Sequence, residues 1–418
     1  MTKVHTPVTD KMDFFKESTP VQLAEKYGTP LYVYNENILR ERCREMKGLV
    51  DYKNFSVNYS AKANSNLELL KIVNEEGLSV DAMSPGEIHA ELAAGFTADR
   101  ILYISNNVSA DEMRFSVDRG IMVSIDSLSQ LDLYGRNFPG TKVALRFNPG
   151  VGAGHHEKVV TAGKKTKFGI APEMMSQVKE IVKKHDLTVA GVNQHIGSLF
   201  MESDAYVKST DSILSIASNF DSLEFVDFGG GFGIPYRKSE GQKRLDLAET
   251  GRLLKQNIDK FIKAYGREIK IKIEPGRYIA AECGIILGRV HSVKENYGSR
   301  YIGTDIGFNV LKRPVMYDSH HEIEIFREKG SIDSSKDCVK IVGNICETGD
   351  ILANDRELPK IVEDDIIAVL DAGAYGFCMS SNYNNRLKPA EVLISSDGSD
   401  KLIRRRDTLE DLMRNFEL

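Results

Sequence analysis

The sequence predicts an α/β protein: a (β/α)8 TIM-like barrel followed by a C-terminal antiparallel β domain. From about residue 35 to 285, short β-branched runs alternate with longer segments of helical period, which indicates parallel strands joined by helices. After about residue 285, strand-like runs follow one another through short connections, which is typical of an antiparallel sheet. We therefore expect an N-terminal segment 1–34 that joins the β domain, a barrel over 35–285 and a β domain over 286–418.

The barrel is predicted from eight strand-like runs. These are Phe55–Tyr59, Leu78–Met83, Ile101–Ser105, Met122–Asp126, Lys142–Asn148, Val189–Ile196, Leu223–Phe228 and Lys270–Glu274. Segments between them, such as Asn66–Glu76 and Pro85–Ala94, carry apolar residues at helical spacing. No dinucleotide-binding fingerprint follows the first run, so a closed barrel is favoured over an open sheet. In such a barrel, function lies at the C-terminal ends of the strands.

The second domain is predicted from seven further runs. These are Ile285–Val293, Arg300–Thr304, Glu322–Phe326, Cys338–Val342, Ile366–Leu370, Glu391–Ile394 and Lys401–Arg405. The early strand Thr29–Tyr34 is expected to pair with this domain. Thr19–Tyr27 is expected to form a helix, and Met1–Glu17 to be loosely ordered.

Composition excludes several classes of function. The chain has 418 residues and a net charge of −5, which does not suggest a nucleic-acid partner. No apolar run approaches a membrane span, and no signal peptide is visible, so a cytoplasmic location is expected. The five cysteines form no CxxC pair, and His155-His156 and His320-His321 lack a third ligand, so we expect no metal site. These histidines are interpreted as loop residues, and Arg404-Arg405-Arg406 as a solvated strand face.

Polar groups follow most of the barrel strands at their C-terminal ends. They are Lys62, Asp81 with Ser84, Asn106-Asn107, Asp126, Arg146 with Asn148, His195 with Ser198, Asp227 with Gly229-Gly230-Gly231, and Glu274 with Arg277. A lysine that is desolvated at such a position sheds its proton readily and becomes a nucleophile toward carbonyl groups. A nucleophilic amine, an imidazole, a glycine-rich turn and a carboxylate at one mouth suit a phosphorylated aromatic carbonyl cofactor.

Each of these signals also has a structural interpretation. The glycine turn offers backbone N–H groups to a phosphate, but a tight strand-to-helix turn needs glycine too. Glu274 at a strand end suits a protonated pyridine nitrogen, or else a structural ion pair with Arg277. His195 suits a position flat on a cofactor ring, although a histidine there is usually a satisfied core residue.

The second domain carries a further set of reactive groups. Cys346 stands in the polar loop Cys346–Asp350 and suits a proton donor or nucleophile, whereas an inert buried thiol is the commoner state. Arg313 and Tyr317 add a cation and a phenol, and Tyr375 adds a second phenol. By default Arg313 would be a surface residue and the tyrosines would pack with their hydroxyls at an edge.

With these residues in view, the chain resembles the fold-type III pyridoxal-phosphate-dependent decarboxylases, and among them the diaminopimelate decarboxylase family. The matching motifs, in chain order, are Tyr59–Asn64, Arg146–Gly150, Lys167–Gly169, His195–Ser198, Gly229–Gly231, Glu274–Arg277, Cys346–Asp350 and Ala374–Gly376. Each motif is weak or moderate alone, but together and in this order they are highly specific.

The resemblance implies a set of roles. Lys62 would carry the imine with pyridoxal 5'-phosphate and Cys346 would donate a proton, the latter from the partner chain of a homodimer. The other implied cofactor residues are Asp81, His195, Ser198, Gly230, Gly231, Glu274, Arg277 and Tyr375. The implied substrate residues are Arg277, Arg313, Tyr317, Glu347 and Tyr375.

The expected activity is decarboxylation of meso-2,6-diaminopimelate to L-lysine, the last step of lysine biosynthesis. Arg313 and Tyr317 suit the distal carboxylate of this substrate and Glu347 its ammonium. Another basic amino acid or carboxynorspermidine stays an alternative substrate. Glu274 argues against an alanine racemase, and Cys346 and the second domain argue against a cofactor carrier. The chain departs from the family at Asn193, where a histidine is usual, and around Asn106-Asn107.

Overall fold

The computed structural model describes residues 7–150, 163, 166–333 and 335–417. These residues form two compact units. One unit comprises residues 40–235 and 243–279, and we call it the barrel unit. The other comprises residues 1–39, 236–242 and 280–418, and we call it the sheet unit. The short segment 236–242 leaves the barrel sequence to join the sheet unit, which the sequence pattern did not indicate.

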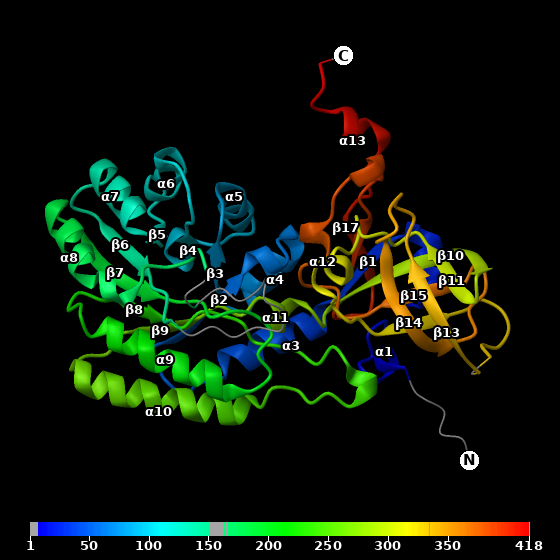
Figure 1. Cartoon of the computed structure of the whole chain (residues 1–418), viewed down its shortest axis with the longest axis horizontal. Helices are drawn as coiled ribbons and strands as arrows, with labels where there is room; N and C mark the ends of the chain where they lie inside the picture. Colours follow the sequence, from blue (N-terminus) through cyan, green and yellow to red (C-terminus); the bar gives the residue numbers. More distant parts are fainter. Residues whose placement is uncertain (1–6, 151–162, 164–165, 334, 418) are drawn as a thin grey trace. The chain divides into compact units, whose positions relative to one another are not determined.

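The barrel unit contains a closed parallel barrel of eight strands, as predicted (Figure 1). The strands are β2 (Phe55–Ser60), β3 (Ser79–Ala82), β4 (Ile101–Ile104), β5 (Met122–Ile125), β6 (Lys142–Arg146), β7 (Thr188–Asn193), β8 (Phe225–Asp227) and β9 (Lys270–Ile273). Pairing between β2 and β9, with Phe55 opposite Ile271, closes the barrel. The predicted order of strands is therefore confirmed, with ends that differ by a few residues.

Helices surround these strands in Figure 1. They are α3 (Glu36–Lys47), α4 (Leu67–Glu75), α5 (Pro85–Ala93), α6 (Ala110–Val117), α7 (Leu128–Asn137), α8 (Met175–Lys184), α9 (Ser203–Ala217), α10 (Leu247–Tyr265) and α11 (Arg277–Ala280), and the two end helices α3 and α11 cross the boundary between the units. Capping residues define where several of these helices begin. Ser84 accepts a hydrogen bond from the Glu87 N–H at the start of α5, and Pro85 occupies its first position.

The barrel interior is partly apolar and partly polar. Leu102, Ile104, Ala144 and Phe225 form one apolar cluster. Nearby positions are polar: the Ser124 hydroxyl on β5 donates to the Asn193 side-chain oxygen on β7 at 2.7 Å. Asn193, which departs from the family pattern, is therefore held across the barrel by a hydrogen bond.

The sheet unit is built on a mixed sheet. Its strands among the described residues are β1 (Leu31–Asn35), β10 (Gly284–Asn296), β11 (Ser299–Thr304), β12 (Ile323–Phe326), β13 (Lys336–Val342), β14 (Ile351–Pro359), β15 (Ile366–Val369), β16 (Ala390–Ile394) and β17 (Asp400–Arg404). Most pairs are antiparallel, as expected, but β1–β16 and β11–β13 are parallel. The N-terminal strand joins this sheet as predicted. Strand β14 was not foreseen, because its Asn-Asp-Arg-Glu centre lacks apolar alternation.

Short helices complete this unit. They are α1 (Val8–Lys11), α2 (Pro20–Tyr27), α12 (Arg313–Tyr317) and α13 (Leu409–Met413). The helix expected over Thr19–Tyr27 is confirmed, and a capping box between Thr19 and Gln22 starts it. The expectation of loose order up to residue 17 is wrong for the described part, since α1 forms there and Phe14 is 1% exposed.

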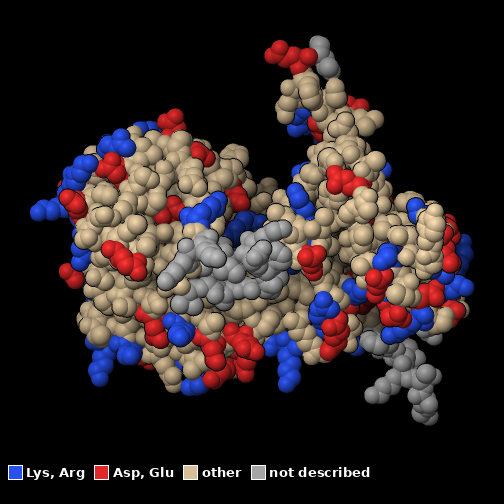
Figure 2. Space-filling view, viewed as in Figure 1, with Lys and Arg blue, Asp and Glu red and all other residues tan. Residues whose placement is uncertain are grey.

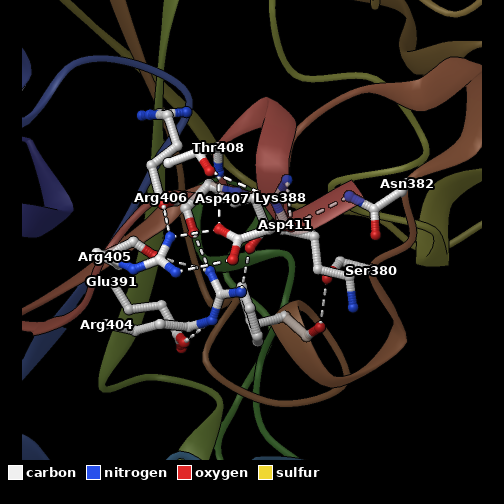
Figure 3. A network of polar contacts seen from close by, with 12 residues as sticks. Ser380, Asn382, Lys388, Glu391, Arg404, Arg405, Arg406, Asp407, Thr408 and Asp411 are labelled. Carbon is white, nitrogen blue, oxygen red and sulfur yellow. Dashed lines mark hydrogen bonds and ion pairs between the residues drawn. The ribbon is translucent and has the colours of Figure 1, made fainter. Parts of the chain in front are cut away.

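The three consecutive arginines near the C-terminus form a solvated face only in part: Arg405 is exposed, as the sequence interpretation has it, whereas Arg404 and Arg406 are half-buried. Figure 3 shows them within a network of ion pairs and hydrogen bonds. Arg404 pairs with Asp407, and Arg405 pairs with Asp411 at the start of α13. Arg406 donates to the Pro30 carbonyl oxygen at 2.7 Å. The network ties the last strand to α13 and to the segment before β1.

Charges on the visible face are of both signs. Figure 2 shows acidic and basic side chains interspersed over it, so opposite charges there partly offset one another. Within the described ranges, no helix combines the length and apolar character needed to span a bilayer. The same residues contain no group of three or more His, Cys, Asp or Glu side chains placed to bind a metal ion.

Candidate active site

The C-terminal ends of the barrel strands bring the predicted polar groups together. Lys62 lies in a 3-10 turn directly after β2. Asp81 stands in β3, the next strand, with 0% exposure, and accepts a hydrogen bond from the Ser60 hydroxyl at 2.8 Å. Burial raises the pKa of the Asp81 carboxyl to about 7, and the ammonium of Lys62 opposes that shift. A lysine and a buried acid therefore interact at this mouth.

Glu274 follows β9 and is buried at 3% exposure. Burial, and then the charges of Asp227 and Asp81, raises its pKa well above the ordinary range, while Lys62 opposes the shift. Asp227 on β8 accepts from Glu274 and from the Gly229 N–H, so the proton rests on Glu274. One oxygen of Glu274 has no hydrogen-bond partner among the described residues. This carboxyl can pair with a basic ring nitrogen.

His195 lies at the end of β7 beside the glycine turn. Its Nδ1 accepts a hydrogen bond from the Gly230 N–H at 3.2 Å, which leaves the proton of the neutral ring on Nε2. Burial, and then the charges of Lys62 and Arg146, holds the His195 pKa well below its usual range. The imidazole is therefore neutral, and a neutral flat ring is suited to packing against a cofactor ring.

The glycine turn is required by close backbone packing. A Cβ at Gly230 would lie 1.9 Å from the Glu274 carbonyl oxygen. A Cβ at Gly231, whose φ is +110°, would lie 2.6 Å from the Gly197 carbonyl oxygen. The tight-turn interpretation thus explains these glycines, and the turn also packs Gly231 against the segment that leads to Ser198.

Ser198 and Arg277 form the third part of the mouth. The Arg277 guanidinium donates to the Ser198 hydroxyl from Nη2 at 2.9 Å and from Nε at 3.3 Å. Arg277 is 6% exposed. A buried cation, a hydroxyl and the backbone at Gly231 form a set of groups that suits a phosphate dianion.

These groups fit pyridoxal 5'-phosphate. The Lys62 amine could bond to its aldehyde. The Glu274 oxygen that lacks a hydrogen-bond partner could pair with its ring nitrogen, and Arg277 and Ser198 could bind its phosphate. The fit rests on residues of the barrel unit alone. This mouth is therefore the candidate cofactor site.

Other predicted site residues belong to the sheet unit and are described within it. Cys346 is exposed, and its backbone N–H donates to Asn384 at 2.9 Å. Glu347 is also exposed and accepts a hydrogen bond from the Tyr383 hydroxyl. Tyr317 and Tyr375 are half-buried, and Tyr375 has a φ of +55°. The exposed thiol departs from the buried, inert state that is commoner for free cysteine.

Arg313, in contrast, is 1% exposed, so the default surface position is wrong. Its Nη1 lies 2.9 Å from Nε2 of His321, which is itself 3% exposed. His321 lies in a loop before β12, as the sequence indicates, but it is buried there, and His155-His156 lie outside the described residues. Sequence reasoning missed this pair because neither residue follows a strand of the barrel.

Two further groups near the barrel mouth stand among the strand-end polar groups of the sequence but were given no role there. Asp227 contacts Glu274, and its position directly before the glycine turn was the available signal. Arg146 is 7% exposed and influences the pKa of His195. A charged side chain at the end of an otherwise apolar strand was the signal for Arg146.

Comparison with known proteins agrees with this geometry. Residues 36–281 match the family model described as the pyridoxal-binding domain of pyridoxal-dependent decarboxylases. The chain is 41% identical to the diaminopimelate decarboxylase of Methanothermobacter thermautotrophicus over 94% of this chain and 93% of that protein. A crystal structure of a diaminopimelate decarboxylase superposes with a TM-score of 0.88 at 31% identity, covering 96% of this chain and 98% of that one.

A second solved structure carries a bound ligand. The diaminopimelate decarboxylase of Helicobacter pylori, complexed with L-lysine, has a TM-score of 0.86 at 28% identity and covers 94% of this chain and 98% of that one. The family model spans more than half of the chain, and the relatives match over nearly their full length. The chain belongs to the diaminopimelate decarboxylase family of pyridoxal-phosphate-dependent decarboxylases.

Proposed function

We propose that this protein decarboxylates meso-2,6-diaminopimelate to L-lysine and carbon dioxide, the last step of lysine biosynthesis. The observation that carries the proposal is the convergence of Lys62, Glu274 and the Arg277–Ser198 pair at one barrel mouth. The names of the relatives, and the L-lysine in one of them, support the choice of substrate.

The chemistry divides between the cofactor and this chain. When bound, the cofactor's protonated pyridine ring takes up the electron pair that remains as carbon dioxide leaves. Glu274 would hold a proton at the ring nitrogen, because burial and the charges of Asp227 and Asp81 keep a proton on this carboxyl, which it would share with that nitrogen. His195 would pack on the ring, and Arg277, Ser198 and Gly231 would hold the phosphate. Lys62 would anchor the cofactor between turnovers through its amine.

A proton must replace the lost carboxylate. We assign this step to the Cys346 thiol, which is exposed and therefore accessible to another molecule. The bond to the carboxylate breaks with its electron pair left on the substrate side, and the proton then passes from Sγ to the α-carbon. The thiolate that remains takes a proton from solvent before the next turnover. In this proposal Cys346 acts at the site of the partner chain in a homodimer, and the protein works in the cytoplasm, where free cysteines stay reduced.

The substrate is recognised by its distal amino-acid head. Arg313 and Tyr317 bind the distal carboxylate and Glu347 binds the distal ammonium, while Tyr375 contributes to both cofactor and substrate sites. A charge-assisted arginine contact is worth about 1.5–3 kcal/mol. Ornithine lacks a distal carboxylate and would gain nothing from Arg313.

One assay tests the proposal directly. Carbon dioxide release from purified protein is measured with meso-diaminopimelate, ornithine, arginine and carboxynorspermidine at equal concentration. We expect release from meso-diaminopimelate at a kcat/KM at least about tenfold above the others, the factor that 1.4 kcal/mol gives. A higher kcat/KM on any of the other three would replace the proposed substrate with that compound.

Arg313→Ala should raise KM for meso-diaminopimelate by about ten- to a hundredfold with a smaller change in kcat, because about 1.5–3 kcal/mol of distal contact is lost. Steady-state kinetics measure the two constants. Lys312→Ala is the matched control, since Lys312 is an exposed cation next in the chain. An unchanged KM in Arg313→Ala would move the carboxylate contact to another residue.

Cys346→Ala and Lys62→Ala homodimers should each be nearly inactive, yet recover activity when mixed. After random subunit exchange about half of the pairs are heterodimers, each with one intact site of two, so activity should return to about a quarter of wild type. Native mass spectrometry verifies exchange. Cys338→Ala, an exposed cysteine of the same unit, should stay active alone. Exchange without recovery would mean that Cys346 serves its own chain.

A further inference from the structure

The guanidinium of Arg313 is held by two neutral rings of the sheet unit. Nη1 lies 2.9 Å from Nε2 of His321, and the guanidinium carbon lies 4.7 Å from the centre of the Tyr236 ring. The rings of Tyr236 and His321 meet edge to face at 5.4 Å. Tyr236 belongs to the short segment 236–242 that leaves the barrel sequence. We call these two rings the Arg313 clamp.

The hydrogen bonds fix the state of His321. Its Nδ1 lies 2.7 Å from the Leu370 carbonyl oxygen, and a carbonyl only accepts. Nδ1 therefore carries the proton, and Nε2 presents a lone pair to Arg313, which only donates. In the neutral tautomer both contacts are made at once. A protonated ring would instead point an N–H at the N–H of Arg313.

The backbone around His321 is held in place. His321 stands two residues before β12, which pairs antiparallel with β15, with Ile323 opposite Val369. The Leu370 N–H donates to the Glu322 carbonyl oxygen at 2.9 Å, one residue away from the His321–Leu370 bond. The paired strand ends thus fix the position of the imidazole. The imidazole in turn fixes the direction of one N–H of the guanidinium.

We propose that His321 is a positioning residue for substrate selection. It orients the guanidinium fork of Arg313 toward the distal carboxylate of the substrate, and it adds no negative charge that would cancel the positive charge of the arginine. The proposal rests on the role of Arg313 in the proposed function. A carboxylate in place of His321 would orient the fork equally well but would compete with the substrate's own carboxylate. A neutral acceptor holds the guanidinium and adds no negative charge beside it.

Two substitutions separate the two hydrogen bonds of His321. In His321→Asn the amide nitrogen replaces Nδ1 and keeps the hydrogen bond to Leu370, but no atom of the asparagine side chain reaches Arg313. In His321→Gln the longer side chain brings an oxygen to the position of Nε2, so the contact with Arg313 is kept. His320→Asn is the control, because His320 lies beside Arg356 and Glu322.

The readouts are the KM for meso-diaminopimelate and the inhibition constants of L-lysine and cadaverine, its counterpart without a carboxylate. His321→Asn should raise the KM and the L-lysine constant about tenfold, as expected for one hydrogen bond to a charged group. We expect kcat and the cadaverine constant to stay within about twofold. In His321→Gln the KM and the L-lysine inhibition constant should both stay close to their wild-type values. In an Arg313→Lys background, which already lacks the fork, His321→Asn should add little.

Each alternative outcome has a distinct meaning. Wild-type protein that releases no carbon dioxide from meso-diaminopimelate contradicts the proposed function and the role of His321 with it. Active wild type with equal weakening of L-lysine and cadaverine in His321→Asn contradicts only the positioning role and leaves a structural one. If His321→Asn does not fold, as judged by its thermal transition, His321→Gln decides: a loss equal to that of Arg313→Ala contradicts the proposal, and near wild-type constants support it.

Discussion

Lys62→Ala is expected to abolish covalent attachment of pyridoxal phosphate and to lower the rate of decarboxylation by more than about 10²–10⁴-fold, the range of a single lost proton-transfer group. The amine lies after β2 within the electrostatic reach of Asp81, His195 and Glu274. Borohydride reduction of wild-type protein, followed by peptide mass spectrometry, should place the reduced cofactor on Lys62.

Two further variants separate the covalent role of Lys62 from its charge. Lys62→Arg keeps a cation beside Asp81 but cannot form the bond, so it should be as inactive as Lys62→Ala. Lys71→Ala removes an exposed lysine of α4 and should behave as wild type. Reducible cofactor still bound to protein in Lys62→Ala would contradict the assignment.

Glu274→Gln is expected to lower kcat by about two to three orders of magnitude, the usual loss when one preorganised electrostatic partner is removed. The amide keeps the shape of the carboxyl but cannot hold a proton on a ring nitrogen. Turnover close to wild type would show that Glu274 is structural. Glu91→Gln is the matched control: burial, and then Asp81 and Glu87, raises the Glu91 pKa to about 9, so that group is already neutral and should be replaceable.

Stability separates a catalytic from a structural Glu274. Its pKa is raised in the folded protein above the ordinary value of 4.5. Folding without cofactor therefore takes up a proton above that value, and the stability contributed by the protonated acid falls as pH rises toward the folded pKa. Glutamine removes this dependence. Cofactor-free Glu274→Gln should unfold at the same or a higher temperature than wild type near pH 8, whereas loss of a structural ion pair would lower it.

Local patterns, formed by residues that are neighbours in the sequence, predicted most of the architecture. The barrel strands were identified because β-branched runs and helical periodicity depend on residues that are near one another in the chain. The carboxyl ends of parallel strands meet at one mouth in a barrel, so the order of strands also predicted that Lys62, His195 and Glu274 converge. The polar strand β14 was not predicted from the sequence, because the burial of this strand cannot be inferred from its own residues.

The amino-acid sequence alone determined the succession of elements, the residue types at the barrel mouth and the family, since each is expressed in local pattern and order. Tertiary structure alone decided two features: the proton that buried Glu274 retains beside Asp227, and the burial of Arg313 against His321 and Tyr236. These depend on desolvation and on contacts between distant segments. For that reason an arginine and a histidine that pattern places on the surface form one buried pair.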